Sequence, residues 1–228
     1  MTEAPEETAV QRLEQEATIE YRYELVRKAI HLCSLSIPVV YSFVPKSFAL
    51  QLLGPVALFF LSVDLARLYI PSFAPVFYKV FGWLLRRKEQ TTAVKRLNGA
   101  TNVLLSACLC ILIFPKLITI TAFAILIIAD STSALIGRRF GKRKFFEKSL
   151  EGSLAFLISA MAVVMVTPKI AHDWREYVIG FFAAAIGAVV EAGSTKIDDN
   201  ISIPLSVGMA MWGLYWLLLP GVDLSSVM

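Results

Sequence analysis

The sequence predicts an all-α protein, a bundle of about seven transmembrane helices. Hydrophobic residues make up 57% of the 228 residues, and the mean hydropathy is +0.65; both values are too high for an ordinary soluble domain. The apolar residues are also grouped in runs, several of them near the roughly 17 to 25 residues that a helix needs to cross a bilayer. We therefore expect a polytopic integral membrane protein.

Seven runs are candidate spans, at residues 30–44, 48–70, 101–114, 117–137, 154–167, 177–193 and 203–219. Pro38 interrupts the first run, and Pro115 followed by Lys116 predicts a tight turn between the third and the fourth. No internal repeat or long linker divides the chain. We expect one membrane domain, residues 25–228, after an acidic cytoplasmic tail, residues 1–24.

Positive charge predicts a cytoplasmic N-terminus and an outer C-terminus, because cytoplasmic loops of membrane proteins are enriched in Lys and Arg. With this orientation only four of the 22 basic residues face outward: Lys46, Lys116, Lys169 and Arg175. Residues 71–96 alternate aromatic and aliphatic side chains before a basic end, which is typical of an amphipathic helix at the inner leaflet. The compact size favours a bacterial inner membrane over the endoplasmic reticulum.

Residues 129–153 contain the most informative polar side chains. Asp130 lies in the inner part of the bilayer, where a charged group is costly and therefore marks a candidate site. A continuing helix places it on one face with Gly137 and Gly141, and five basic residues follow: Arg138, Arg139, Lys142, Arg143 and Lys144. A carboxylate for a divalent cation beside basic groups and glycine backbone is what a nucleotide polyphosphate requires. The alternative is that the charges set topology and the glycines pack helices.

Two further groups lie in the first two spans. Arg27 and His31 share a helix face at the cytoplasmic mouth of the first span, beside Lys28. They form either a substrate site or a simple positive-inside anchor. Asp64 and Arg67 are three residues apart in the second span, a spacing that predicts a structural ion pair.

Acidic residues also gather near the last span. Glu191 ends the sixth span, and Asp198, Asp199 and Asn200 precede the seventh. Asn200 could cap the last helix. Capping requires one residue, so we favour a metal or substrate role for the acids.

With these motifs the chain resembles the CTP-dependent lipid kinase family, which includes dolichol kinase, phytol kinase and CTP-using diacylglycerol kinase. The resemblance runs in order through ELVRKAIH at 24–31, LNGATN at 97–102, Asp130-x3-Ala134-x2-Gly137-x3-Gly141 with Lys148-Ser149-x-Glu151-Gly152-Ser153, and Glu191 with Asp199-Asn200-x3-Pro204. It implies transfer of the terminal phosphate of CTP to a lipid alcohol, with a divalent cation such as Mg²⁺.

The residues and the resemblance together predict a site on the cytoplasmic side. The expected catalytic residues are Arg27, Lys28, Asp130, Lys148 and Glu151, with Glu151 or a loop acid accepting the proton of the lipid hydroxyl. The expected CTP contacts are Asn98, Thr101, Ser133, Gly137, Arg138, Arg139, Gly141, Lys142, Lys144 and Gly152. Asp130, Asp198 and Asp199 are predicted metal ligands, and His31, Glu191 and Asn200 are predicted to support the substrate.

Two other functions remain open from the sequence. A cytidylyltransferase would leave CMP on a lipid phosphate, and a small transporter would use Asp130 and Glu191 as an ion pathway; acids near one face argue against the transporter. The acceptor lipid also stays open among polyprenols, phytol-like alcohols and diacylglycerol, as does the oligomeric state, a homo-oligomer included. We expect no nucleic-acid partner.

Overall fold

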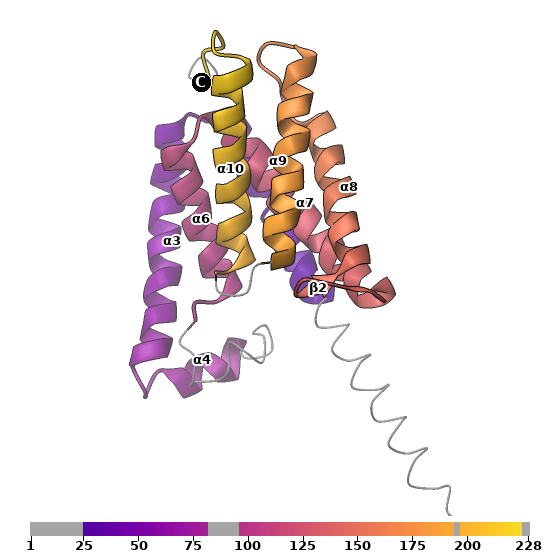
Figure 1. Cartoon of the computed structure of the whole chain (residues 1–228). Coiled ribbons are helices and arrows are strands. Elements are labelled where there is room, and N and C mark those ends of the chain that lie inside the picture. The colour runs from indigo at the N-terminus through magenta and orange to yellow at the C-terminus, as the bar shows by residue number, and fades with distance from the viewer. Residues whose placement is uncertain (1–24, 82–95, 194–196, 225–228) are drawn as a thin grey trace, which may run out of the picture.

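The computed structural model describes residues 25–81, 96–193 and 197–224, which form a bundle of helices (Figure 1). The predicted tail, residues 1–24, and residues 82–95 of the predicted interfacial segment lie outside the described residues. After helical residues 25–33, the elements are α2 (Ser36–Phe43), α3 (Lys46–Tyr69), α4 (Ala74–Phe81), α6 (Gly99–Ile113), α7 (Lys116–Phe140), β1 (Lys144–Phe145), β2 (Lys148–Ser149), α8 (Leu150–Val166), α9 (Trp174–Gly193) and α10 (Asp199–Leu218).

Among the residues that the structure describes, four helices are long and apolar enough to cross a membrane: α3, α7, α9 and α10. Two shorter apolar helices, α6 and α8, accompany them. This confirms the prediction of an all-α membrane bundle. The first predicted span consists of two helical pieces separated by a turn at Ser34 and Leu35. The break therefore precedes Pro38, which lies in the first turn of α2, where a missing backbone N–H is tolerated.

Helix α7 lies in the middle of the bundle. Every residue from Leu117 to Ile127 is buried, and α7 packs against α2, α6, α8 and α10. Helix α3 is different, because Leu58, Phe59 and Phe60 are exposed and present an apolar surface suited to lipid. The buried central helix thus supplies a rigid support for the polar residues near its C-terminal end.

The two ends of the bundle carry different elements, and which end faces the cytoplasm stays a prediction. Figure 1 shows α4 and β2 at one end of the bundle and the C-terminus at the other. Lys46 and Lys116, two of the predicted outward cations, begin α3 and α7. The Asp64–Arg67 ion pair is confirmed, with Arg67 Nη2 2.6 Å from Asp64 Oδ1 and both side chains fully buried.

Candidate active site

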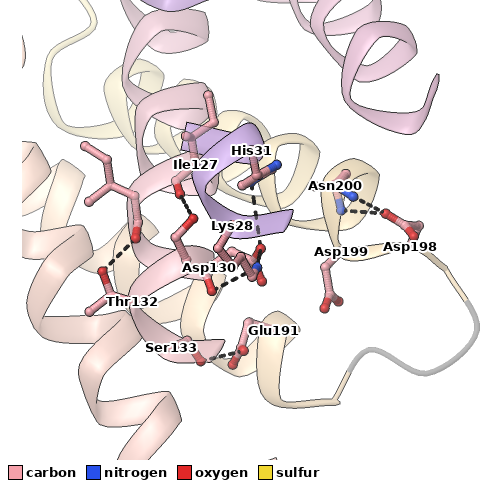
Figure 2. A network of polar contacts seen from close by, with 12 residues as sticks. Lys28, His31, Ile127, Asp130, Thr132, Ser133, Glu191, Asp198, Asp199 and Asn200 are labelled. Atoms are coloured by element: carbon pink, nitrogen blue, oxygen red, sulfur yellow. Dashed lines mark hydrogen bonds and ion pairs between the residues drawn. The ribbon is translucent and has the colours of Figure 1, made fainter. Parts of the chain in front are cut away.

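Asp130 meets two residues from the start of the chain (Figure 2). Lys28 forms an ion pair with its carboxylate and also donates to its backbone carbonyl, at 3.3 Å. The imidazole Nε2 of His31 lies 3.8 Å from Asp130 Oδ2. Lys28 is 4% exposed and Asp130 is 8% exposed. A buried pair of opposite charges thus joins the first helical segment to α7.

Lys148 forms a second charged group with two acids from α9 and α10. Its Nζ lies 2.5 Å from Glu191 Oε1 and 2.9 Å from Asp199 Oδ2. Ser133, nearly one turn after Asp130 on α7, donates a hydrogen bond of 2.8 Å to the same Glu191 oxygen. Glu191 is 1% exposed, and among the described residues no hydrogen-bond donor reaches its other oxygen, Oε2.

A short hairpin carries Lys148 to this position. Strands β1 and β2 pair antiparallel, and the backbone N–H of Glu147 donates to the carbonyl of Ala192 at the end of α9. The hydroxyl of Ser149 then caps α8 by accepting from the N–H of Gly152 at 3.2 Å. The strand, the cap and the contact with α9 together direct Lys148 toward the acids.

Gly137 and Gly152 allow α7 and α8 to touch backbone to backbone. A Cβ on Gly152 would lie 3.1 Å from the carbonyl oxygen of Ser133 and 3.2 Å from the Cα of Gly137. Gly141 is similarly crowded by Ser149. Close packing of α7 on α8 requires Gly137 and Gly152 to lack side chains. Contact of these glycines and of Gly141 with CTP stays a prediction.

The two charged groups influence one another. Burial acts to lower the pKa of the Lys148 ammonium, but the carboxylates of Asp199, Glu191 and Asp130 outweigh it and raise that pKa above its usual value. Three carboxylates thus surround two lysines, and Lys148 carries its positive charge at neutral pH. With three carboxylates and two ammonium groups, the site has a small excess of negative charge.

Several predicted site residues lie apart from this cluster or have another role. Asp198, not Asn200, caps α10, and it accepts both from the backbone N–H and from the side-chain amide of Asn200. Glu151 accepts from the backbone N–H groups of Lys142 and Arg143 at 3.0 and 3.4 Å, and so supports the turn after α7. Four predicted CTP contacts are exposed around that turn: Arg138, Arg139, Lys142 and Lys144. Arg27 is half-buried beside Lys28 in the chain.

Across residues 25–81, 96–193 and 197–224, no three side chains of His, Cys, Asp or Glu form a ready-made metal site. The predicted set of Asp130, Asp198 and Asp199 is therefore not assembled as three converging ligands. Mg²⁺, however, usually takes only one or two protein carboxylates and completes its coordination with phosphates and water. The donor set, with its negative excess and the buried Oε2 of Glu191, is compatible with such a cation.

The other predicted CTP contacts begin α6. Asn98 caps this helix by accepting from the N–H of Thr101 at 2.9 Å, and Thr101 is fully buried. A Cβ on Gly99 would lie 3.7 Å from the side-chain nitrogen of Asn200, so the start of α6 adjoins the start of α10. One contact was not predicted from the sequence: Asp64 Oδ2 accepts from the backbone N–H of Asn98 at 2.6 Å. The spacing of Asp64 and Arg67 predicts only their own ion pair. A contact with a residue 34 positions away leaves no pattern in the local sequence.

Three named kinases are similar to this chain over between 38% and 89% of its length. CTP-dependent diacylglycerol kinase 1 of Saccharomyces cerevisiae is 27% identical over 210 residues, which cover 89% of this chain and 67% of the relative. The kinase of the same name from Schizosaccharomyces pombe is 26% identical over 160 residues, 62% of this chain and 70% of the relative. Dolichol kinase of Schizosaccharomyces pombe is 35% identical over 94 residues, 38% of this chain and 17% of that larger protein.

No family profile and no solved structure matches the chain. The sequence relatives, the membrane bundle and the buried charged cluster nevertheless agree with one another. At modest identity, the similarity to named diacylglycerol and dolichol kinases supports a CTP-dependent lipid kinase family for this chain.

Proposed function

We propose that this chain transfers the γ-phosphate of CTP to the hydroxyl of a membrane lipid, either diacylglycerol or a polyprenol-like alcohol. The new bond joins the lipid oxygen to the γ-phosphorus, the bond to the β-phosphate oxygen breaks, and CDP leaves with that electron pair. The observation that carries the proposal is the charged cluster at one end of the bundle, in which Lys28, Asp130 and Glu191 are buried and Lys148 and Asp199 are partly buried. By the positive-inside rule this end is cytoplasmic, where CTP is available.

Lys28 and Lys148 are the groups suited to the phosphates. Each is a compact cation held by carboxylates before substrate arrives. Each can exchange a carboxylate oxygen for a phosphate oxygen, so that no charge is left unpaired in a buried site. Positioning and charge neutralisation of this kind provide most of the catalysis in phosphoryl transfer.

Asp130 and Asp199 are the residues suited to a divalent cation, with Glu191 next to them. A Mg²⁺ ion bound there would neutralise charge on the transferred phosphoryl group. Glu151 binds the backbone of its own turn, so Glu191 or Asp199 of the Lys148 cluster is a better candidate than Glu151 to accept the lipid proton. Asp199 is the more accessible of the two acids, with a side chain 23% exposed against 1% for Glu191.

The test is transfer of label by the purified protein in lipid nanodiscs with Mg²⁺. CTP labelled at the γ- or the α-phosphate is supplied with diacylglycerol, a polyprenol or phytol. We expect lipid label from the γ position only, loss of transfer in Lys148→Met, and no change in Lys46→Met, which removes an exposed lysine at the opposite end. Transfer from the α position to a lipid phosphate would identify a cytidylyltransferase, and no transfer to any lipid by folded protein would refute the proposal.

A further inference from the structure

The buried Asp64–Arg67 pair connects three parts of the chain near the candidate site. Arg67 donates through Nε to Asp64 Oδ1 at 2.8 Å and through Nη2 to the backbone carbonyl of Arg96 at 2.9 Å. The second oxygen of Asp64 accepts from the N–H of Asn98 at 2.6 Å. Both oxygens of one carboxylate are thus used, one for the pair and one for the segment that begins α6.

Arg67 is also held from the other side by α4. Its guanidinium lies 5.3 Å from the ring centroid of Phe77 and 5.9 Å from that of Tyr78. Phe77 is buried. Such contacts between a cation and an aromatic face stabilise a desolvated guanidinium. The C-terminal end of α3, the start of α6 and helix α4 therefore form one connected unit.

The segment that this unit holds lies next to the start of α10, the helix that carries Asp199. Asn98 caps α6, and Gly99 adjoins the side chain of Asn200. Asn200 donates to Asp198, and Asp199, the residue between them, binds Lys148. A shift at the start of α6 would therefore be felt at the start of α10.

We infer that Asp64 and Arg67 are positioning residues for the nucleotide, because they hold the Asn98–Thr101 turn beside Asn200 and thereby hold the start of α10, where Asp199 binds Lys148. The inference rests on the proposed function. The pair touches neither substrate, and it acts through the backbone N–H of Asn98. If the pair holds the nucleotide, its loss changes KM for CTP and leaves KM for the lipid unchanged. If the pair only stabilises the fold, its loss changes both KM values or neither.

The experiment measures KM for CTP and KM for the lipid separately, in nanodiscs, for wild type and three variants. Asp64→Asn keeps the shape but offers one acceptor oxygen in place of two, and Arg67→Lys keeps the charge but loses the fork that reaches Arg96. The control is Asp173→Asn, which removes the carboxylate of an exposed Asp–Arg pair. Asp173 belongs to the turn before α9, at the end opposite the charged cluster.

We expect Asp64→Asn to lower kcat/KM for CTP by up to about 100-fold, the cost of misplacing a reacting group by about 1 Å, and to do so chiefly through a higher KM for CTP. Arg67→Lys gives a smaller rise, KM for the lipid stays within about twofold in both variants, and Asp173→Asn changes neither value. CTP also protects the wild type against thermal denaturation more than it protects Asp64→Asn. This second measurement works even where turnover is weak.

Four results would overturn the inference. Equal changes in both KM values, or a lower melting temperature with unchanged KM for CTP and unchanged protection by CTP, would show that the pair only stabilises the fold. Absence of CTP binding by folded wild-type protein would refute the proposed function itself, and this inference with it. Binding by the wild type that persists unchanged in Asp64→Asn refutes the inference alone.

Discussion

Neutralising the Lys28–Asp130 pair separates a catalytic role of Asp130 from a purely structural one. Asp130→Asn alone leaves a buried ammonium without a counter-ion, and Lys28→Met alone leaves a buried carboxylate. Breaking a buried pair in this way destabilises a protein by about 3–5 kcal/mol, whereas replacing both charges by neutral groups of similar size changes stability much less. We therefore expect both single variants to melt below the wild type and the double variant, Lys28→Met with Asp130→Asn, to melt above either single variant.

Activity is expected to follow a different order. If Asp130 holds the cation at the phosphates, its loss removes several kcal/mol of transition-state stabilisation, and about 4 kcal/mol corresponds to roughly a 1,000-fold decrease in rate. The double variant then regains stability and remains inactive. The assay pairs thermal melting with γ-label transfer for all four proteins. A double variant that recovers both stability and wild-type activity would show that Asp130 only balances Lys28, and the proposed role would be wrong.

Three other predictions use the same assays. Burial alone would lower the pKa of Lys148, but the neighbouring carboxylates raise that pKa above its usual 10.5. Because the charged form is favoured in the folded state, Lys148 stabilises the fold fully below about pH 10.5. This stabilisation is lost as the pH rises through the folded-state pKa. The stability difference from Lys148→Met should be constant near neutral pH and narrow at alkaline pH, and a difference that grows there would contradict it. Gly208→Ala places a Cβ about 2.5 Å from the Phe114 ring and should lower the free energy of unfolding by about 1–3 kcal/mol. The control, Gly213→Ala, lies in open space on the same helix and should leave stability unchanged. Equal melting temperatures of the two variants would contradict this prediction. Chelation of divalent cations should stop turnover and added Mg²⁺ should restore it, and full activity in chelator would exclude the cation.

The helices were predictable because their signal is local. The fourth predicted span, residues 117–137, corresponds to α7 at Lys116–Phe140, since apolar runs of this length reflect the thickness of the bilayer. The Asp64–Arg67 pair was predictable for the same reason, because residues three apart on a helix face each other. The prediction that Pro38 breaks the first span was wrong, since the break lies at Ser34–Leu35. Proline is tolerated in the first turn of a helix and interrupts a helix only when it lies further inside.

The partners within the site were not predictable, because they depend on tertiary contacts. Lys28 and Asp130 are 102 residues apart, and Lys148 and Glu191 are 43 residues apart. The sequence placed these residues on one side of the membrane but did not indicate which acid would meet which base. It also placed Glu151 among catalytic groups, although that carboxylate accepts from the backbone of its own turn. Charge and spacing alone do not distinguish an acid that binds its own turn from one that faces a substrate.

The close contact of α7 with α8 explains why the polar residues of this bundle form one site. Because Gly137 and Gly152 lack side chains, the two helices approach closely at the level of Ser133. The hairpin just before α8 then delivers Lys148 to Glu191, which Ser133 also binds. A larger residue at either glycine would separate α7 from α8, and with them the Asp130 carboxylate from the Lys148 ammonium. The glycines can therefore be essential for activity without contacting CTP, since the spacing of two helices sets the spacing of the charges.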